Sequence, residues 1–297
     1  MELSGLVAGA DGRWAIVDGG GRVQVFGLAT DCSVRQVVAG GIDPFDVEDL
    51  ARSPDGVFWL ADIGDNDRRR STIALITLSG DGSARLHRLT YPDGPHDAEA
   101  LLLDGVGTPL LVTKEPTGPA GIYQPTGRLA EPGPTPLSRV GQLDLPPSRT
   151  VGGPVGGVGT RLVTGGATTA DSRLAAVRTY TDAWLFPAPD GDLLAALGRP
   201  PMQVPLPGEP QGEAIAFGPD GTLLSGSESP PGTVGKLRAV PGAVARAAVA
   251  TGTTEPPRDA AAPAPEGRVG TVPGILVALA LSALIVFGLG KLRRKKK

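Results

Sequence analysis

Cysteine, histidine and aromatic residues are scarce in this sequence. The single cysteine, Cys32, excludes an internal disulfide and any zinc site built from cysteines. We expect Cys32 to be a small buried or half-buried residue. Three Trp, three Tyr and six Phe are too few for an extensive surface that stacks on bases or sugars.

Basic residues are also scarce outside the last seven positions. Six of the 28 Lys and Arg residues lie within 291–297, which leaves 22 basic against 31 acidic residues and a net charge of −9 for the rest of the chain. Binding to phosphates needs clustered Lys and Arg. We therefore expect no nucleic-acid partner.

Charge is absent from residues 273–290, an apolar run that ends in the basic cluster. As a helix, 18 residues would extend about 27 Å, enough to cross the hydrocarbon core of a bilayer. Because positive flanks stay in the cytoplasm, we predict a single-pass transmembrane helix at 273–290 and a cytoplasmic tail at 291–297. The Pro- and Ala-rich segment 251–272 is predicted to be a stalk.

This orientation places a domain at residues 1–250 outside the cytoplasm, on the cell membrane. No export signal follows Met1, where Glu2 and Leu3 already resemble a strand. Either the natural start lies upstream, or the protein is tail-anchored with its domain inside. We favour the first.

Glycine and proline are abundant, and they separate short apolar runs that repeat. Five segments share a residue followed, about seven positions later, by Asp-Gly or a related turn: Ser4, Glu48, Glu99, Thr164 and Glu213. These residues are 44, 51, 65 and 49 positions apart. Each interval suits one unit of four short strands.

A repeat of this length favours a β-propeller over a β-sandwich, whose strands do not repeat in sets of four. No segment is typical of a soluble helix. We predict an all-β fold, a β-propeller of five blades with four antiparallel strands each. The 65-residue interval and an upstream start would allow six.

The repeat also suggests a site. The first strand of each propeller blade lines the central channel, so Glu48, Glu99 and Glu213 should converge at one channel mouth. Carboxylates gathered there repel one another unless a cation neutralises them, and oxygen ligands suit Ca²⁺ or Mg²⁺. The alternative is that each Glu caps its own turn or pairs with Lys114 or Arg178.

The loop after Leu60 carries more charge than a turn needs. Asp62, Asp65 and Asn66 could bind a cation, and Arg68 and Arg69 an anionic ligand or a protein partner. The loop could equally be a solvated hairpin whose charges pair locally.

Two histidines are present. His96 precedes Glu99 and could act as a base near the channel mouth, whereas His87 lies in an alternating strand and is expected to be exposed. No nucleophile elbow accompanies either of them.

The chain contains the motifs Glu-Asp-Leu-Ala (48–51), Trp-Leu-Ala-Asp-Ile-Gly-Asp-Asn (59–66), Val-Thr-Lys-Glu (112–115), Val-Arg-Thr-Tyr-Thr-Asp-Ala (177–183) and Pro-Gln-Gly-Glu-Ala-Ile (210–215). Together these motifs resemble a group of uncharacterised actinobacterial exported β-propeller proteins. The chain is more distantly similar to esterase-like phytase and gluconolactonase-type propellers. That resemblance implies metal-assisted hydrolysis through Glu48, Glu99 and Glu213.

The leading hypothesis is a membrane-anchored extracytoplasmic β-propeller, without enzymatic activity, that binds a protein or a small anionic ligand at the cell surface. The alternative is a divalent-metal-dependent hydrolase of phosphoesters or lactones, acting at an acidic channel mouth. A structural spacer is the third class.

Overall fold

A computed structural model describes residues 3–18, 20–229 and 236–252. The chain divides into two units, Met1–Thr254 and Glu255–Lys297, and everything below concerns the first. The predicted transmembrane helix, the basic tail and the stalk from residue 253 onward lie outside the described residues. Within the described ranges, no helix is long and apolar enough to cross a membrane.

The described residues form antiparallel strand groups that follow one another along the chain, which confirms the all-β class. The first group is β1 (Leu3–Gly9), β2 (Gly12–Val17), β3 (Gln24–Leu28) and β4 (Val34–Ala39). The second is β5 (Val47–Arg52), β6 (Phe58–Asp62), β7 (Ile73–Leu78) and β8 (Ala84–Thr90). The third is β9 (Ala98–Leu103), β10 (Pro109–Thr113), β11 (Ala120–Pro125) and β12 (Thr135–Leu143).

Two further groups and three short helices complete the described part. They are β13 (Val163–Thr168), β14 (Leu174–Thr179), β15 (Asp182–Pro187) and β16 (Met202–Pro205), then β17 (Gln211–Phe217), β18 (Leu223–Glu228) and β19 (Leu237–Val240). The helices are the 3-10 helix η1 (Gly156–Thr160), α1 (Leu193–Leu197) and α2 (Ala243–Gly252). The sequence signals missed all three.

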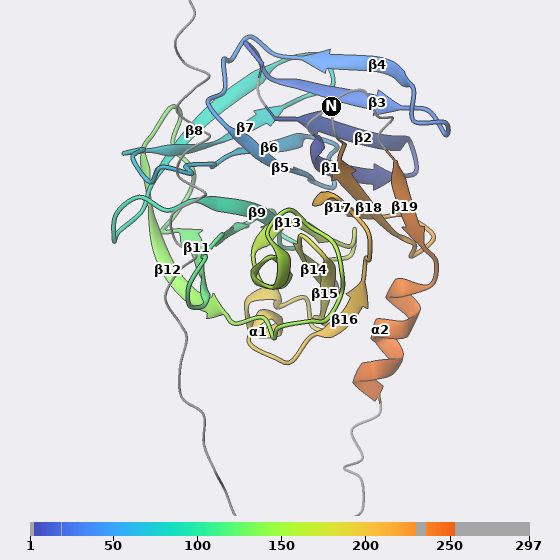
Figure 1. Cartoon of the computed structure of the whole chain (residues 1–297). Coiled ribbons are helices and arrows are strands. Elements are labelled where there is room, and N and C mark those ends of the chain that lie inside the picture. The colour runs from blue at the N-terminus through green and yellow to red at the C-terminus, as the bar shows by residue number, and fades with distance from the viewer. Residues whose placement is uncertain (1–2, 19, 230–235, 253–297) are drawn as a thin grey trace, which may run out of the picture. The chain divides into compact units, whose positions relative to one another are not determined.

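The first strands of the groups close a ring, as expected for a propeller. We call β1, β5, β9, β13 and β17 the inner strands; β1 contacts β5, β5 contacts β9, β9 contacts β13, β13 contacts β17, and β17 returns to β1. In Figure 1 these strands lie near the centre, and β4, β8 and β12 lie toward the periphery. This ring fixes which residues can face one another along the axis.

Tight turns join each inner strand to the second strand of its group. Gly12, Gly56 and Gly221 hold these turns at φ values of +128°, +86° and +76°, where glycine is unstrained. In the degenerate fourth copy Ser172 takes the same role at φ +55°. The repeated Asp-Gly pair is therefore explained by turn geometry.

The long interval between Glu99 and Thr164 contains no additional strand group. It holds β12, which pairs in parallel with β8 and joins the second and third groups into one eight-stranded sheet. The segment after β12 then carries η1 before β13 begins.

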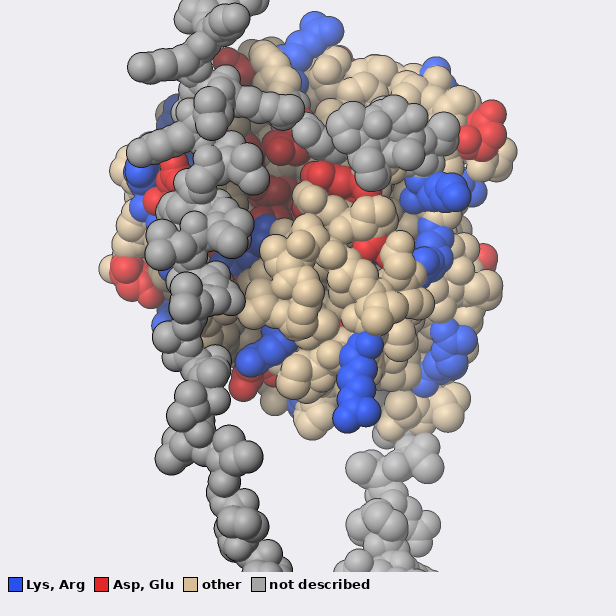
Figure 2. Space-filling model, in the orientation of Figure 1, with Lys and Arg blue, Asp and Glu red and all other residues tan. Residues whose placement is uncertain are grey.

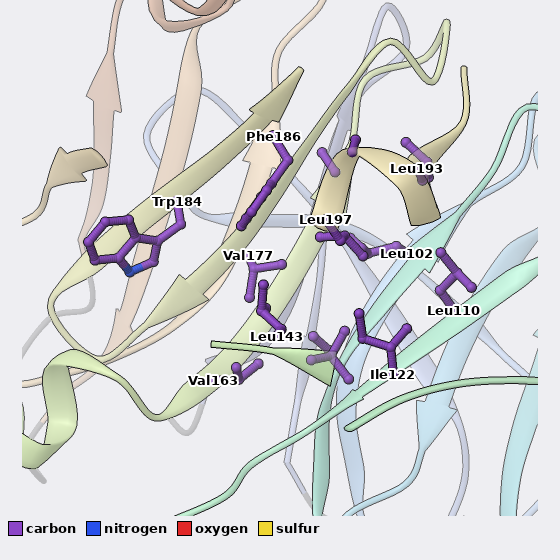
Figure 3. Packing of buried hydrophobic residues seen from close by; sticks show 14 of the residues in the cluster. Leu102, Leu110, Ile122, Leu143, Val163, Val177, Trp184, Phe186, Leu193 and Leu197 are labelled. Atoms are coloured by element: carbon purple, nitrogen blue, oxygen red, sulfur yellow. The ribbon is translucent and has the colours of Figure 1, made fainter. Parts of the chain in front are cut away.

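Hydrophobic layers fill the spaces between neighbouring groups. Between the third and fourth groups, Leu102 and Val112 pack with Val177, Trp184 and Phe186 (Figure 3). The short helix α1 adds Leu193 and Leu197 to the same cluster. Burying each such side chain contributes about 1.5–3 kcal/mol, so these layers hold the groups in place.

Two sequence expectations about single residues are wrong. Cys32 is exposed, because it occupies a turn at φ +66° between β3 and β4. His87 is buried, because Ala130 from the segment before β12 approaches it and its carbonyl lies 3.1 Å from His87 Nδ1.

Candidate functional site

The repeated polar position coincides with a β-bulge in every inner strand. The pairing registers of β1, β5, β9 and β13 skip Ser4, Glu48, Glu99 and Thr164, and that of β17 shifts across Glu213 and Ala214. A bulge leaves one residue out of the ladder and redirects its side chain. We call the end of the ring at which these residues lie the mouth.

Glu48 and Glu99 form a carboxyl pair at the mouth. Both residues are buried, at 8% and 2% exposure, and their carboxyl groups lie within hydrogen-bond reach of each other. Burial raises both pKa values, and the repulsion between the two carboxyl groups raises that of Glu48 further. Two carboxyl groups in contact need a shared proton or a cation.

Lys114 supplies one such cation. Its Nζ lies 2.5 Å from Glu99 Oε1 and 5.2 Å from the centroid of the Tyr180 ring. Burial acts to lower the pKa of Lys114, but Glu99 and Tyr180 raise it more, so the ammonium stays charged. Lys114 thus lies next to Glu99, as in the sequence-based alternative that Lys114 pairs with one of the repeated glutamates.

A second carboxyl pair joins Asp46 to Asp18, the residue that follows β2. Their side chains are within hydrogen-bond reach, and burial followed by the charge of Asp18 raises the pKa of Asp46 to about 6. Gly64 leaves room for this arrangement, because a Cβ there would collide with the carboxyl groups of Asp46 and Glu48.

A third pair lies at the start of β17. Glu213 contacts Glu228, and Gln211 Nε2 donates to Glu213 Oε1 at 2.9 Å. Burial, together with Glu99 and Glu228, raises the pKa of Glu213 to about 8. The three predicted glutamates thus lie at one end of the ring, each with a carboxyl neighbour.

Arg178 is not a free ligand group. It is fully buried, pairs with Glu209, and donates to Ser225 Oγ and the carbonyl of Ala214. This buried ion pair ties β14 to β17 and β18 beneath the mouth.

The loop between β6 and β7 is organised by its own charges. Asp62 accepts from the backbone N–H groups of Phe45 and Asp46 and pairs with Arg70 at 2.9 Å. Asp65 accepts from the N–H groups of Arg69 and Arg70. These two carboxylates shape the loop.

The remaining loop residues face outward. Asn66 is exposed, the Arg69–Asp67 pair is exposed, and Arg68 reaches Glu115 at 2.6 Å. The Arg69–Asp67 pair is local, whereas the Arg68–Glu115 pair ties the loop to the segment after β10.

His96 lies beside the mouth in an aromatic cluster. Its Nε2 lies 3.0 Å from Asp93 Oδ1 and from Tyr123 Oη, and its ring contacts those of Tyr91 and Tyr123. No serine or cysteine nucleophile is among these contacts. The cluster fastens the segment that leads into β9.

Asp49 closes the middle of the ring. Its carboxylate is fully buried and accepts from the N–H groups of Leu50, Leu101 and Gly166, which belong to three inner strands. Burial raises its pKa well above the ordinary value, and the three N–H donors act in the opposite direction. The two ends of the ring are therefore separate.

A cavity of about 1060 Å³ lies at the opposite end, among the Asp-Gly turns. Its carboxylates are already engaged: Asp11 pairs with Arg52 at 2.6 Å, and Asp104 and Asp220 accept from their own turns. We place the candidate site at the mouth instead, because there the carboxyl groups of Asp18, Asp46, Glu48 and Glu99 adjoin one another.

In Figure 2, acidic side chains gather in a recess near the centre of the visible face, bordered by an uncharged surface. Sequence reasoning missed Asp46 and Tyr180 as members of the site.

The carboxyl groups at the mouth follow one another around the ring. Asp46 contacts Asp18, the carboxyl groups of Asp46 and Glu48 both border Gly64, and Glu48 contacts Glu99. Among residues 3–18, 20–229 and 236–252 there is no group of three or more His, Cys, Asp or Glu side chains that could hold a metal ion.

Comparisons with known proteins gave distant structural likenesses. No protein-family model and no curated protein matches the chain. A gluconolactonase from Xanthomonas campestris aligns over 80% of this chain and 72% of its own, with 14% identity and a TM-score of 0.45. Virginiamycin B lyase from Staphylococcus aureus aligns over 81% and 70%, with 12% identity and a TM-score of 0.39.

A chain of the nidogen–laminin complex aligns over 76% of this chain and 72% of its own, with 14% identity and a TM-score of 0.43. The resemblance to gluconolactonase-type proteins is thus confirmed only as a distant likeness. Because the scores are low, the fold assignment depends on the ring of inner strands.

Proposed function

We propose that this chain is a membrane-anchored, extracytoplasmic β-propeller of five blades that binds a ligand at its acidic mouth. The observation that carries this proposal is the set of three carboxyl pairs, Asp18–Asp46, Glu48–Glu99 and Glu213–Glu228, at one end of the ring. Holding buried carboxyl groups together costs free energy. A ligand that neutralises them would recover that cost on binding.

The proposed anchor is the apolar run 273–290, with residues 251–272 as the stalk and 291–297 as the cytoplasmic tail. It is supported by the length of the run and by the six basic residues after it. The mouth would then be presented to the cell exterior.

A thermal-shift panel on the full chain tests the binding function. The panel contains amines, carboxylic acids, sugars, short peptides and divalent cations, and each is added to the wild type and to the double variant Glu48→Gln/Glu213→Gln. At least one class should raise the melting temperature of the wild type and have a smaller effect on the double variant, because binding stabilises only the folded form that retains the site.

The matched control is Asp55→Asn/Asp220→Asn, which removes two carboxylates from turns at the other end of the ring. This control should respond like the wild type. If every probe acts equally on all three proteins, binding at the mouth is wrong.

The second candidate is a divalent-metal-dependent hydrolase. One observation favours it: Glu48 and Glu99 are neighbouring carboxyl groups whose pKa values are raised to different extents, an arrangement suited to acid–base catalysis. Calcium titration by calorimetry, with Glu48→Gln and Glu213→Gln as comparison variants, separates the two functions. Absence of both heat and thermal shift would exclude the metal hydrolase.

A further inference from the structure

We propose that the mouth recognises the ammonium group of an organic amine that carries an apolar body. This inference rests on the proposed binding function and names the chemical class of its ligand. It replaces both the metal ion and the anionic ligand expected from the sequence.

The first argument is that one carboxyl pair already has an ammonium group beside it. The Lys114 ammonium contacts Glu99 Oε1 at 2.5 Å and lies over the Tyr180 ring. This is an ammonium held by a carboxylate and an aromatic face, built from the chain itself. The pair Asp18–Asp46 offers the same carboxylate chemistry.

The second argument concerns coordination. A calcium ion takes six to eight oxygens that converge on one point, and the described residues contain no such group. An ammonium has three N–H donors and needs only two or three acceptors in a looser arrangement. Carboxyl groups that adjoin one another without forming such a group fit the ammonium better.

The third argument is an unpartnered hydroxyl in the same ring of positions. Ser4 is 1% exposed, and its Oγ has no hydrogen-bond partner among the described residues. Thr164, at the equivalent bulge, donates to the carbonyl of Gly212 on the next inner strand at 2.8 Å. Ser4 makes no such bond, so its buried oxygen is left to accept an N–H from a ligand.

The fourth argument is the apolar rim. Phe45 directly precedes Asp46 and is 73% exposed. Its backbone N–H is held by Asp62, and its ring stacks on the guanidinium of Arg70 at 4.7 Å. A large exposed aromatic ring fixed beside a carboxyl pair suits a ligand with an apolar group next to its charge.

A second part of the rim comes from the segment before β13. Val151, Val155 and Val158 are exposed at 72%, 50% and 52%. Gly153 in the same segment lies so close to Tyr180 that a Cβ there would be 2.9 Å from Tyr180 Cβ. These valines therefore extend an uncharged surface outward from the Lys114–Tyr180 contact.

Calorimetric titration of the full chain at pH 8 tests the inference with four probes. n-Hexylamine has both the ammonium and the apolar body, ethylamine has little apolar body, 1-hexanol lacks the charge, and CaCl₂ is the bare cation. n-Hexylamine should bind, ethylamine should bind at least about fivefold more weakly, and 1-hexanol and calcium should give no saturable heat. Extra buried methylenes favour the longer amine.

Three variants locate the site. Asp46→Asn should weaken n-hexylamine binding about tenfold, and Ser4→Ala and Phe45→Ala about threefold to fivefold each, as expected for a lost ion pair, hydrogen bond or ring contact. Val106→Ala is the matched control, because Val106 is an 89% exposed valine in a turn at the opposite end and should leave the affinity unchanged. Circular dichroism confirms that each variant is folded.

The outcomes separate the inference from the proposed function. Calcium binding without amine binding, or n-hexylamine binding that Asp46→Asn leaves unchanged, overturns the amine inference. If another class of compound in the thermal-shift panel still stabilises the wild type more than Glu48→Gln/Glu213→Gln, the proposal that the mouth binds a ligand stands. If no class does, both proposals are wrong.

Discussion

Among the described residues, Lys114 carries the only ammonium in contact with Glu99, and Glu99 is almost completely buried. Removing one partner of a buried ion pair leaves the other charge without compensation, which is far more costly than losing an exposed pair. The charge balance at the mouth therefore depends on this one side chain.

Replacing Lys114 with Met should lower the free energy of unfolding by about 3–5 kcal/mol at pH 8. At pH 5 the loss should be smaller, because Glu99, whose pKa is raised to about 7, takes up a proton in the folded state. Urea denaturation at both pH values measures the difference.

Arg85→Met is the control for Lys114→Met. It breaks the Arg85–Glu131 pair, whose side chains are 69% and 48% exposed, and should cost no more than about 1 kcal/mol at either pH. Equal, small losses for the two variants would contradict the role given to Lys114.

Glu213 makes stability depend on pH in the opposite sense to an ordinary carboxylate. Burial raises its folded pKa to about 8 from a value of 4.5 in the unfolded chain. The folded state thus retains a proton that the unfolded state loses, so stability falls as the pH rises from about 4.5 through 8.

Glu213→Gln should remove this fall. The variant should match the wild type near pH 4 and melt a few degrees higher at pH 8.5, where 1 kcal/mol corresponds to about 2–4 °C. Differential scanning calorimetry across this range provides the comparison, with Glu131→Gln at an exposed site as control. A wild-type melting temperature that rises between pH 5 and 8 and does so equally in Glu213→Gln would refute the assignment.

Among the elements, the inner strands and the strands paired with them could be predicted, because each contains part of the repeated sequence pattern. The repeated positions Glu48 and Glu99, for example, lie in β5 (Val47–Arg52) and β9 (Ala98–Leu103). β12 and β16 were missed because prolines in and around them obscure the alternation, and pairing with β8 or β15 fixes them instead. α1 is held by packing against β15, which a local pattern does not reveal.

The site was predictable only to the level of its repeated position. The alignment identified Glu48, Glu99 and Glu213, but the bulge that redirects them appears only in the pairing registers. The contacts of Asp18 with Asp46, and of Tyr180 with Lys114, join different strand groups, so no local spacing encodes them.

The loop that follows β6 supports the mouth through Gly64. Gly64→Ala should displace the carboxyl groups of Asp46 and Glu48, because the new Cβ would collide with both. Amine affinity should fall several-fold, and the melting temperature should change little if these side-chain ends can move.

Gly41→Ala is the matched substitution, since nothing lies within 4 Å of the position of its Cβ. Gly41→Ala should alter neither the amine affinity nor the melting temperature. Unchanged amine affinity in Gly64→Ala would show that Gly64 does not shape the site.

At the scale of the whole molecule, the proposed topology places the mouth outside the cell. Protease added to intact cells should then digest the unit Met1–Thr254 and spare a tag attached after Lys297. Immunoblotting against both parts reads the result, and permeabilised cells serve as the control. A domain that survives in intact cells and is lost after permeabilisation would reverse the orientation.

The β-bulges have a consequence for how such a molecule can be altered. Because Ser4, Glu48, Glu99 and Thr164 stand outside the ladder registers, the ladder hydrogen bonds do not depend on their side chains. Other side chains could be introduced at these positions while hydrogen bonding in the sheets is preserved. The fold thus offers a small set of positions around one axis that a library of variants could diversify.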